Sequence, residues 1–273
     1  MFKLNSMLLS LTLVCFLSNF AYGAVELKGE LNLDKDIKPN PYPGVVTSQV
    51  TINGNGHSID GSGGRGITQQ DQNVNYSIDV NQVGGFNLTA PTENSADTVV
   101  KFNEQGELVR YEIKDTGSAH NFDNNNQSGT FINSRTNVNI TDSVIKDNTP
   151  GTTNAQYGGA IKVLNNDKAA GVETKIIGSY FTGNHLSNNN TAQGGAIWAQ
   201  QKNGKLTILD SYFTKNTVNA GTATSSFIQG GAIFNSSGAV DIKNSYFGFN
   251  TVTGTSAKGG AIYGDYYSVD NGF

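Results

Sequence analysis

The chain has 273 residues, a formal net charge of −4 at pH 7 and only 15% charged residues. It carries no basic stripe of the kind that binds nucleic acid and no block of like charges that would mark an electrostatic tail, so neither function is expected. Its 33 glycines fall at fixed offsets between apolar segments, which predicts turns and not disorder.

Residues 1–23 have the pattern of a secretory signal peptide. Lys3 gives a basic start, Met7 to Leu17 is an apolar run, and Ala21-Tyr22-Gly23 is a small-x-small cleavage site. The run is shorter than the roughly 20 apolar residues that span a bilayer, although an uncleaved anchor is the alternative. Because the single cysteine, Cys15, lies inside this segment, we expect an exported mature chain without disulfides.

The next segments are expected to begin a solenoid. Residues 24–44 would cap its N-terminal end, and residues 45–136 would form the first rungs, with irregular insertions. Val50 and Ile52 alternate as in a strand, and the Gly/Asn pairs after them suit corners. The stretch 69–136 is the least regular and is interpreted as one or two rungs with long insertions, including the loop from Asn121 to Ser128.

Residues 137–273 repeat one pattern. Ser-Tyr-Phe begins at positions 179, 211 and 245, and Gly-Gly-Ala-Ile begins at positions 158, 194, 230 and 259. A period between 20 and 50 residues predicts stacked units, here near 137–171, 172–204, 205–238 and 239–273. Each unit opens with apolar alternation, as at Val138 and Ile140, which predicts a strand. The fold class is therefore all-β.

Each unit also carries a Phe-x-x-Asn element, and the first unit has Ile145 in the aromatic position. Equal positions of stacked strands lie about 4.8 Å apart, so the rings should stack and the amides should hydrogen-bond up the axis. Asn also tolerates the left-handed backbone that a corner requires. The expected ladder residues are Ile145, Phe181, Phe213 and Phe247, with Asn148, Asn184, Asn216 and Asn250.

The paired glycines allow positive φ and close backbone approach, and the isoleucine after them should fill the core. The repeat glycines are Gly158, Gly159, Gly194, Gly195, Gly230, Gly231, Gly259 and Gly260. The residue after the isoleucine varies, as expected of an outward position. The polar segments between Asn and Gly-Gly are interpreted as loops that protrude from each unit.

Gly-Gly-Ala-Ile paired with Phe-x-x-Asn resembles the motif pair of the polymorphic outer-membrane protein family, a class of bacterial autotransporters. The resemblance covers roughly residues 137–273. It implies a right-handed parallel β-helix, a passenger displayed at the cell surface for adhesion to host cells or bacteria. The family's C-terminal membrane barrel, the expected link to the outer membrane, is not visible. The chain stops inside a fourth unit, so we expect a passenger truncated at its C-terminus.

The rival hypothesis is a polysaccharide lyase or hydrolase, since parallel β-helices also carry such enzymes. Hydrolases need two carboxylates across one groove, and the signatures of pectin-type enzymes are absent from the sequence. His57 alone resembles a fragment of such a site, and His120 and His185 lack further ligands at metal spacing. Carboxylates that converge on His57 and Asp60 would favour the enzyme. We expect no catalysis, metal or cofactor; a nonfunctional truncated product is the third hypothesis.

Two aromatic series are candidate binding strips. Tyr180, Tyr212 and Tyr246 should point outward beside the core Phe, either shielding backbone edges or binding a ligand. Trp198, Phe234 and Tyr263 form the second series. With the adhesin role that the resemblance implies, the predicted function is that of an adhesin-like passenger that binds a surface protein or glycan of a host or bacterium through its exposed loops and aromatic ladders. Removal of an outward Tyr should destabilise the chain much less than removal of a core Phe.

Overall fold

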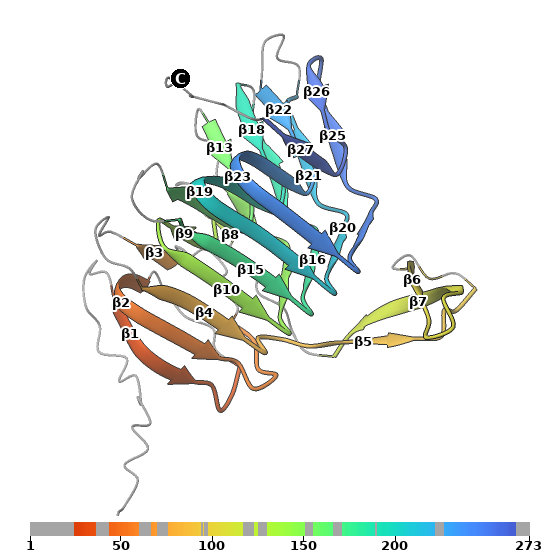
Figure 1. Ribbon diagram of the computed structural model, residues 1–273, viewed down its shortest axis with the longest axis horizontal. Helices are drawn as coiled ribbons and strands as arrows, with labels where there is room; N and C mark the ends of the chain where they lie inside the picture. Colours follow the sequence, from red (N-terminus) through yellow and green to blue (C-terminus); the bar gives the residue numbers. More distant parts are fainter. Residues whose placement is uncertain are drawn as a thin grey trace, which may run out of the picture.

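The computed structural model describes residues 25–36, 44–59, 67–69, 76–93, 95, 98–116, 123–124, 130–150, 155–165, 171–188, 190–221 and 227–265. Every regular element in these ranges is a β-strand. The strands stack into an elongated solenoid, and one small antiparallel sheet projects from its side (Figure 1). No helix here is long and apolar enough to cross a membrane. The all-β parallel β-helix predicted from the repeats is confirmed; the predicted signal peptide, residues 1–23, lies outside the described residues.

The largest sheet has eleven parallel strands in two arms. Its strands are β1 (Val25–Asn32), β2 (Gly44–Asn53), β3 (Ile67–Gln69), β4 (Ser77–Asn81), β9 (Ile132–Ser134), β10 (Asn137–Thr141), β14 (Ile161–Asn165), β15 (Glu173–Ile177), β19 (Ile197–Leu209), β23 (Ile233–Lys243) and β27 (Ile262–Gly264). Strands β4, β10 and β15 form one arm, and β3, β9 and β14 form the other. The long strands β2 and β19 pair with both arms and join them.

Smaller parallel sheets complete the circumference. They comprise β11 (Val144–Lys146), β16 (Tyr180–Thr182), β20 (Tyr212–Thr214) and β24 (Tyr246–Gly248); β17 (His185–Ser187), β21 (Thr217–Asn219) and β25 (Thr251–Thr253); β13 (Ala155–Tyr157), β18 (Thr191–Gln193), β22 (Phe227–Gln229) and β26 (Ala257–Lys258); and the pair β8 (Asp123–Asn124) and β12 (Thr149–Pro150). The polar segments expected to be loops thus contain short strands, because Leu186 and Val218 in them are buried.

The N-terminal region differs in detail from the expected cap and rungs. Strand β1 pairs in parallel with β2 and extends the largest sheet by one strand, while Leu27 and Leu31 pack against the core. The irregular stretch supplies β4 and β9 to the solenoid. Between them it inserts an antiparallel sheet of β5 (Phe86–Thr89), β6 (Thr98–Phe102) and β7 (Leu108–Asp115). This sheet projects from the side of the stack in Figure 1, and one of its faces packs against β16 and β20.

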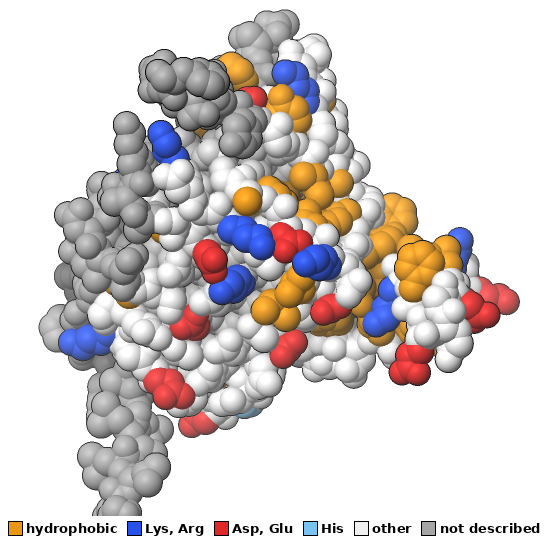
Figure 2. Space-filling view, viewed as in Figure 1, with side chains coloured by type: hydrophobic (Ala, Val, Ile, Leu, Met, Phe, Trp, Pro, Cys, Tyr) orange, Lys and Arg blue, Asp and Glu red, His pale blue; other side chains and the backbone are white. Residues whose placement is uncertain are grey.

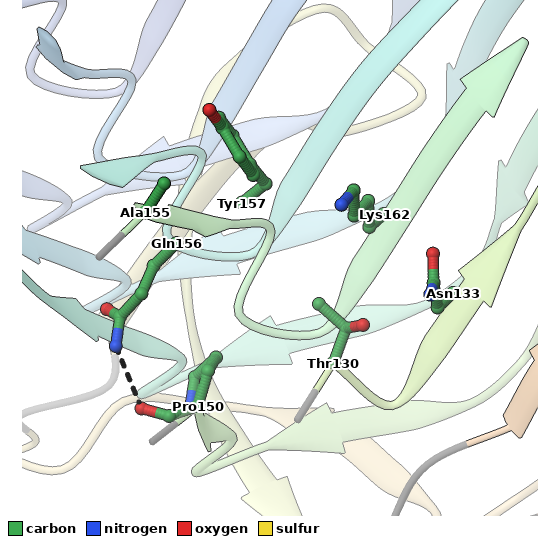
Figure 3. Close-up of a pocket in the computed structure, with 7 residues that line it drawn as sticks. All are labelled: Thr130, Asn133, Pro150, Ala155, Gln156, Tyr157 and Lys162. Carbon is green, nitrogen blue, oxygen red and sulfur yellow. Dashed lines mark hydrogen bonds between the residues drawn. The ribbon is translucent and has the colours of Figure 1, made fainter. Parts of the chain in front are cut away.

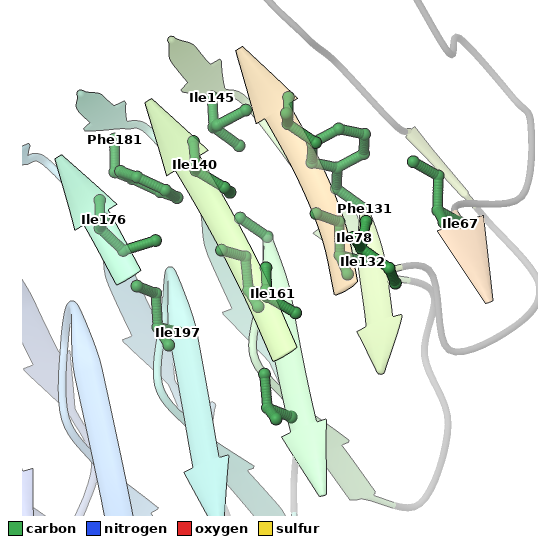
Figure 4. Close-up of a cluster of buried hydrophobic side chains, with 14 of the residues drawn as sticks. Ile67, Ile78, Phe131, Ile132, Ile140, Ile145, Ile161, Ile176, Phe181 and Ile197 are labelled. Carbon is green, nitrogen blue, oxygen red and sulfur yellow. The ribbon is translucent and has the colours of Figure 1, made fainter. Parts of the chain in front are cut away.

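The interior of the solenoid is filled by aliphatic and phenylalanine side chains in register columns (Figure 4). Ile161 pairs with Ile197 across neighbouring rungs, and Ile197 pairs with Ile233. The expected phenylalanine ladder is present: the ring centroids of Phe181 and Phe213 lie 4.8 Å apart at 7°. Stacked units therefore bury identical residues against one another, which explains why the apolar positions repeat.

The corners of the rungs use left-handed backbone. The residue before the Ser-Tyr-Phe strand has positive φ in all four units, namely Asp142, Gly178, Asp210 and Asn244. At the next corner the left-handed residue is the one before the asparagine, such as Lys215 with φ of 55°. The prediction that the asparagine itself supplies the left-handed position is therefore wrong. Its contribution is made through its side chain.

That contribution is a buried amide ladder. The Asn184 Nδ2 donates to Asn216 Oδ1 at 2.8 Å, and Asn148 and Asn216 make the equivalent bonds at 2.7 and 2.9 Å. Each amide oxygen also accepts a backbone N–H from the preceding rung, as Asn250 does from Asn216. A serine ladder that sequence reasoning missed runs alongside, in which Ser211 Oγ accepts the backbone N–H of Ser179. These bonds satisfy polar groups that the stacking buries.

Two aromatic strips and a basic pocket as candidate binding sites

The tyrosine strip points away from the solenoid core, as its place in the pleat predicts, but it is not a free surface. Tyr180 and Tyr212 are only 2% and 6% exposed, and Tyr246 is half-buried beside them. The sheet of β5, β6 and β7 lies on top of them. The ring of Phe86 lies 5.6 Å from that of Tyr180 and 5.7 Å from that of Tyr212.

The covering sheet is built to pack there. Val99 and Ile113 project from the same face of the antiparallel pair and are buried in the cluster that includes the tyrosines. Phe102 and Leu108 face each other near the hairpin end and are exposed. The expectation that these tyrosines form an accessible binding strip is therefore wrong, because a distant insertion covers them.

This packing changes the expected cost of removing a tyrosine. Tyr212→Ala should lower the free energy of unfolding by about 3 kcal/mol, as for other buried aromatic truncations. It should also speed amide hydrogen exchange at Val99 and Ile113, because β5–β7 loses the surface on which it packs. Tyr212→Phe is the matched control and should leave both unchanged. Unchanged exchange in Tyr212→Ala would contradict the assigned packing.

The second aromatic series lies at the double-glycine corner. Lys162, Trp198, Phe234 and Tyr263 occupy one register column. The Trp198 and Phe234 rings stack at 6.4 Å and 10°, and the Phe234 and Tyr263 rings at 5.8 Å and 22°. The residues immediately before Gly-Gly form a second column of Tyr157, Gln193, Gln229 and Lys258. We call these eight residues the double-glycine strip.

The two columns hold each other in place across the corner. Trp198 Nε1 donates to Gln193 Oε1 at 3.1 Å, and Gln193 Nε2 donates to Gln229 Oε1 at 2.5 Å. Trp198 and Phe234 are consequently only 6% and 3% exposed, although they point away from the core. The predicted outward position is correct, but the rings in the middle of the strip are not accessible. The more accessible groups are at its ends, where Tyr157, Lys162 and Tyr263 are half-buried and Lys258 is exposed.

The glycines make this corner. The first glycine of each pair has positive φ, for example 72° at Gly194 and 68° at Gly230. The second allows close approach between rungs, because a Cβ on Gly195 would lie 2.0 Å from the carbonyl oxygen of Gly231. The glycine pairs therefore set both the turn and the rung spacing that bring the two columns together.

A pocket of about 110 Å³ opens at the N-terminal end of the strip (Figure 3). Its lining includes Lys162, Tyr157, Gln156, Asn133, Thr130 and Pro150. The Lys162 ammonium lies 5.0 Å from the centroid of the Tyr157 ring and 5.8 Å from that of Trp198. Burial, and then the positive charge of Arg135, lowers the pKa of Lys162 from its ordinary value. Sequence reasoning missed this pocket, because its residues come from two neighbouring rungs.

The face formed by the first arm of the largest sheet has a different character. Charged side chains of both signs are spread over it (Figure 2). Lys205 pairs with Asp241 at 3.0 Å, and Lys175 pairs with Glu173 at 2.8 Å. Exposed pairs of this kind contribute little and keep the face hydrated.

The residues considered for catalysis or metal binding do not assemble a site in the described ranges. His57 Nδ1 lies 3.5 Å from Asp36 Oδ1, and that oxygen accepts the backbone N–H of Ser58, which lowers the pKa of Asp36. Asp60 and His120 lie outside the described residues. His185 contacts Thr217 Oγ1 through Nδ1 at 2.5 Å, and burial lowers its pKa. Within the described part of the chain, no group of three or more His, Cys, Asp and Glu could hold a metal ion.

Comparison of the chain with protein-family models, with curated proteins and with solved structures found no match. The observations that bear on function are therefore the repeat, the fold and the groups at the double-glycine corner.

Proposed function

We propose that this chain is an exported, adhesin-like passenger of the polymorphic outer-membrane type, which binds a glycan or protein on a host or bacterial surface. The observation that carries the proposal is the double-glycine strip, in which stacked rings lie beside two glutamine amides and a lysine and a tyrosine stand at each end. Aromatic faces bordered by a few hydrogen-bond donors are typical of recognition sites. The strip follows the stacking axis. Its middle rings and amides are buried, so a ligand would contact mainly the half-buried and exposed groups at its two ends.

Export and surface display rest on the sequence. The pattern of residues 1–23 favours secretion, and the Gly-Gly-Ala-Ile and Phe-x-x-Asn pairs favour an autotransporter passenger. The solenoid suits the role because its neighbouring rungs support a long surface without a single large core.

A binding screen tests the proposal. Labelled protein of residues 24–273 would be applied to an array of host and bacterial surface glycans and to fixed cells. We expect saturable binding that falls at least tenfold in the double variant Tyr263→Ala, Lys258→Gln, because the half-buried Tyr263 and the exposed Lys258 form the C-terminal end of the strip. Lys243→Gln serves as the control. It also removes one lysine charge, but from an ion pair with Asp241 on the charged face of the largest sheet.

Two results would contradict the proposal. One is no binding to any glycan or cell by a chain whose circular dichroism shows folded β-structure. The other is binding that both the double variant and Lys243→Gln leave unchanged, since the ligand would then contact another surface.

A further inference from the structure

The pocket beside Tyr157 contains a cation whose charge is not balanced. In the part of the chain that the structure describes, no carboxylate forms an ion pair with Lys162, and the charged group that most affects it is another cation, Arg135. The side chain is half-buried, so its charge is partly removed from water. The rings of Tyr157 and Trp198 offset part of that cost. A negative charge in the pocket would offset more.

The pocket also holds an unpartnered polar group. Thr130 is 4% exposed, and its Oγ1 has no hydrogen-bond partner among the residues that the structure describes. A buried hydroxyl without a partner is costly, and such exceptions call for a cause. Thr130 lines the same pocket as Lys162 and Asn133, and in Figure 3 the ammonium end of Lys162 points toward Tyr157. A ligand with acceptor oxygens would pair with the Lys162 ammonium, whereas Thr130 Oγ1 lies enclosed in the pocket wall.

These groups select the chemistry of the ligand. The polar groups that line the pocket include an ammonium, an amide and a hydroxyl, and none of the lining residues is Asp or Glu. The Tyr157 ring, held against Trp198 at 5.1 Å and 54°, provides an aromatic wall. A small anion alone would contact the ammonium but not the Tyr157 ring. An anionic group attached to a sugar ring would use both.

We propose that the pocket is a subsite for a carboxylate-bearing sugar of a surface glycan, with the carboxylate on Lys162 and the sugar ring against Tyr157. The inference rests on the proposed function, since it names the class of ligand that the double-glycine strip recognises. The volume of about 110 Å³ fits a carboxylate and the adjoining ring edge, and the remainder of the glycan would continue along the strip.

Ligand binding in the pocket can be followed by the fluorescence of a tryptophan beside it. Trp198 is the single tryptophan, and its ring lies 5.8 Å from the Lys162 ammonium. Tryptophan fluorescence of residues 24–273 would be titrated with glucuronate and with glucose, which differ only in the carboxylate at C6. We expect a saturable change with glucuronate at concentrations where glucose gives none. Glucose 6-sulfate tests whether an anion of another kind suffices.

Variants of Lys162 decide the assignment. Lys162→Gln should weaken glucuronate binding at least tenfold, Lys162→Arg should retain it, and Lys243→Gln should behave as the unaltered chain. The emission spectrum of each free variant shows whether the Trp198 environment is intact. Equal affinity for glucose, a stronger response to the sulfate ester, or an unchanged response in a folded Lys162→Gln would overturn the inference. Array binding that persists in Lys162→Gln would leave the proposed function standing while removing this subsite.

Discussion

Phe213→Ala is expected to lower the free energy of unfolding by about 3 to 5 kcal/mol. Phe213 is fully buried and stacks between Phe181 at 4.8 Å and Phe247 at 4.9 Å. Truncation leaves a cavity between two rungs that the flanking backbone cannot fill, because both rungs are held by parallel strand pairing. Chemical denaturation of residues 24–273 measures the loss.

The matched control is Phe247→Ala in the last described unit. Phe247 is half-buried and has the ring of Phe213 as its stacking partner. Its removal should therefore cost less than half as much. Equal losses at the two positions would show that the ladder does not set the stability of the stack.

Gly231→Ala should destabilise the chain by about 3 kcal/mol, at the upper end of the cost of overpacking. A Cβ at this position would lie 2.0 Å from the carbonyl oxygen of Gly260 and 2.9 Å from the backbone of Thr251. These atoms belong to the neighbouring rung's backbone, so relief requires the rungs to separate. Thermal and chemical unfolding both report the effect.

Gly260→Ala makes the same change where space is available. The nearest atom to its Cβ would be the Asn250 carbonyl oxygen at 3.8 Å. Its φ is not in the left-handed region, so alanine should be neutral or stabilise by about 0.5 kcal/mol through the unfolded state. A loss at Gly260→Ala as large as at Gly231→Ala would mean that backbone conformation, and not rung contact, selects these glycines.

The repeat predicted much of the fold because stacked units impose equal environments on equal positions. Phe181 and Phe213 are interchangeable in the sequence pattern and lie in register in the structure. The same holds for the asparagine ladder. Asp142 and Asp210 likewise share positive φ, although the residue type at this corner varies between units.

The sequence could not predict the fate of the tyrosine strip, since alternation tells which side of a strand a residue faces but not what covers that side. The covering segment had its own signal. Val109, Tyr111 and Ile113 alternate with charged residues, and Asn103 to Gly106 suits a hairpin turn. Its packing onto Tyr180 and Tyr212 is a contact between segments that are distant in the sequence. A repeat pattern does not predict such contacts.

The double-glycine strip was predicted only in part for a related reason. Trp198 and Phe234 were identified as outward residues, and they do leave the core. At a concave corner, however, two outward columns cover each other, so Gln193 and Gln229 bury the rings beside them. The glutamine that precedes Gly-Gly in two successive units was the available sequence signal for the second column.

The central claim is that ligands bind along the double-glycine strip. Amide hydrogen exchange of residues 24–273, with and without the tightest glycan from the array, tests it most directly. The account predicts slower exchange at residues 155–163, 191–199 and 227–234, with β5–β7 unchanged. Protection confined to residues 86–115, or to the first arm of the largest sheet, would place the binding surface elsewhere and contradict the claim.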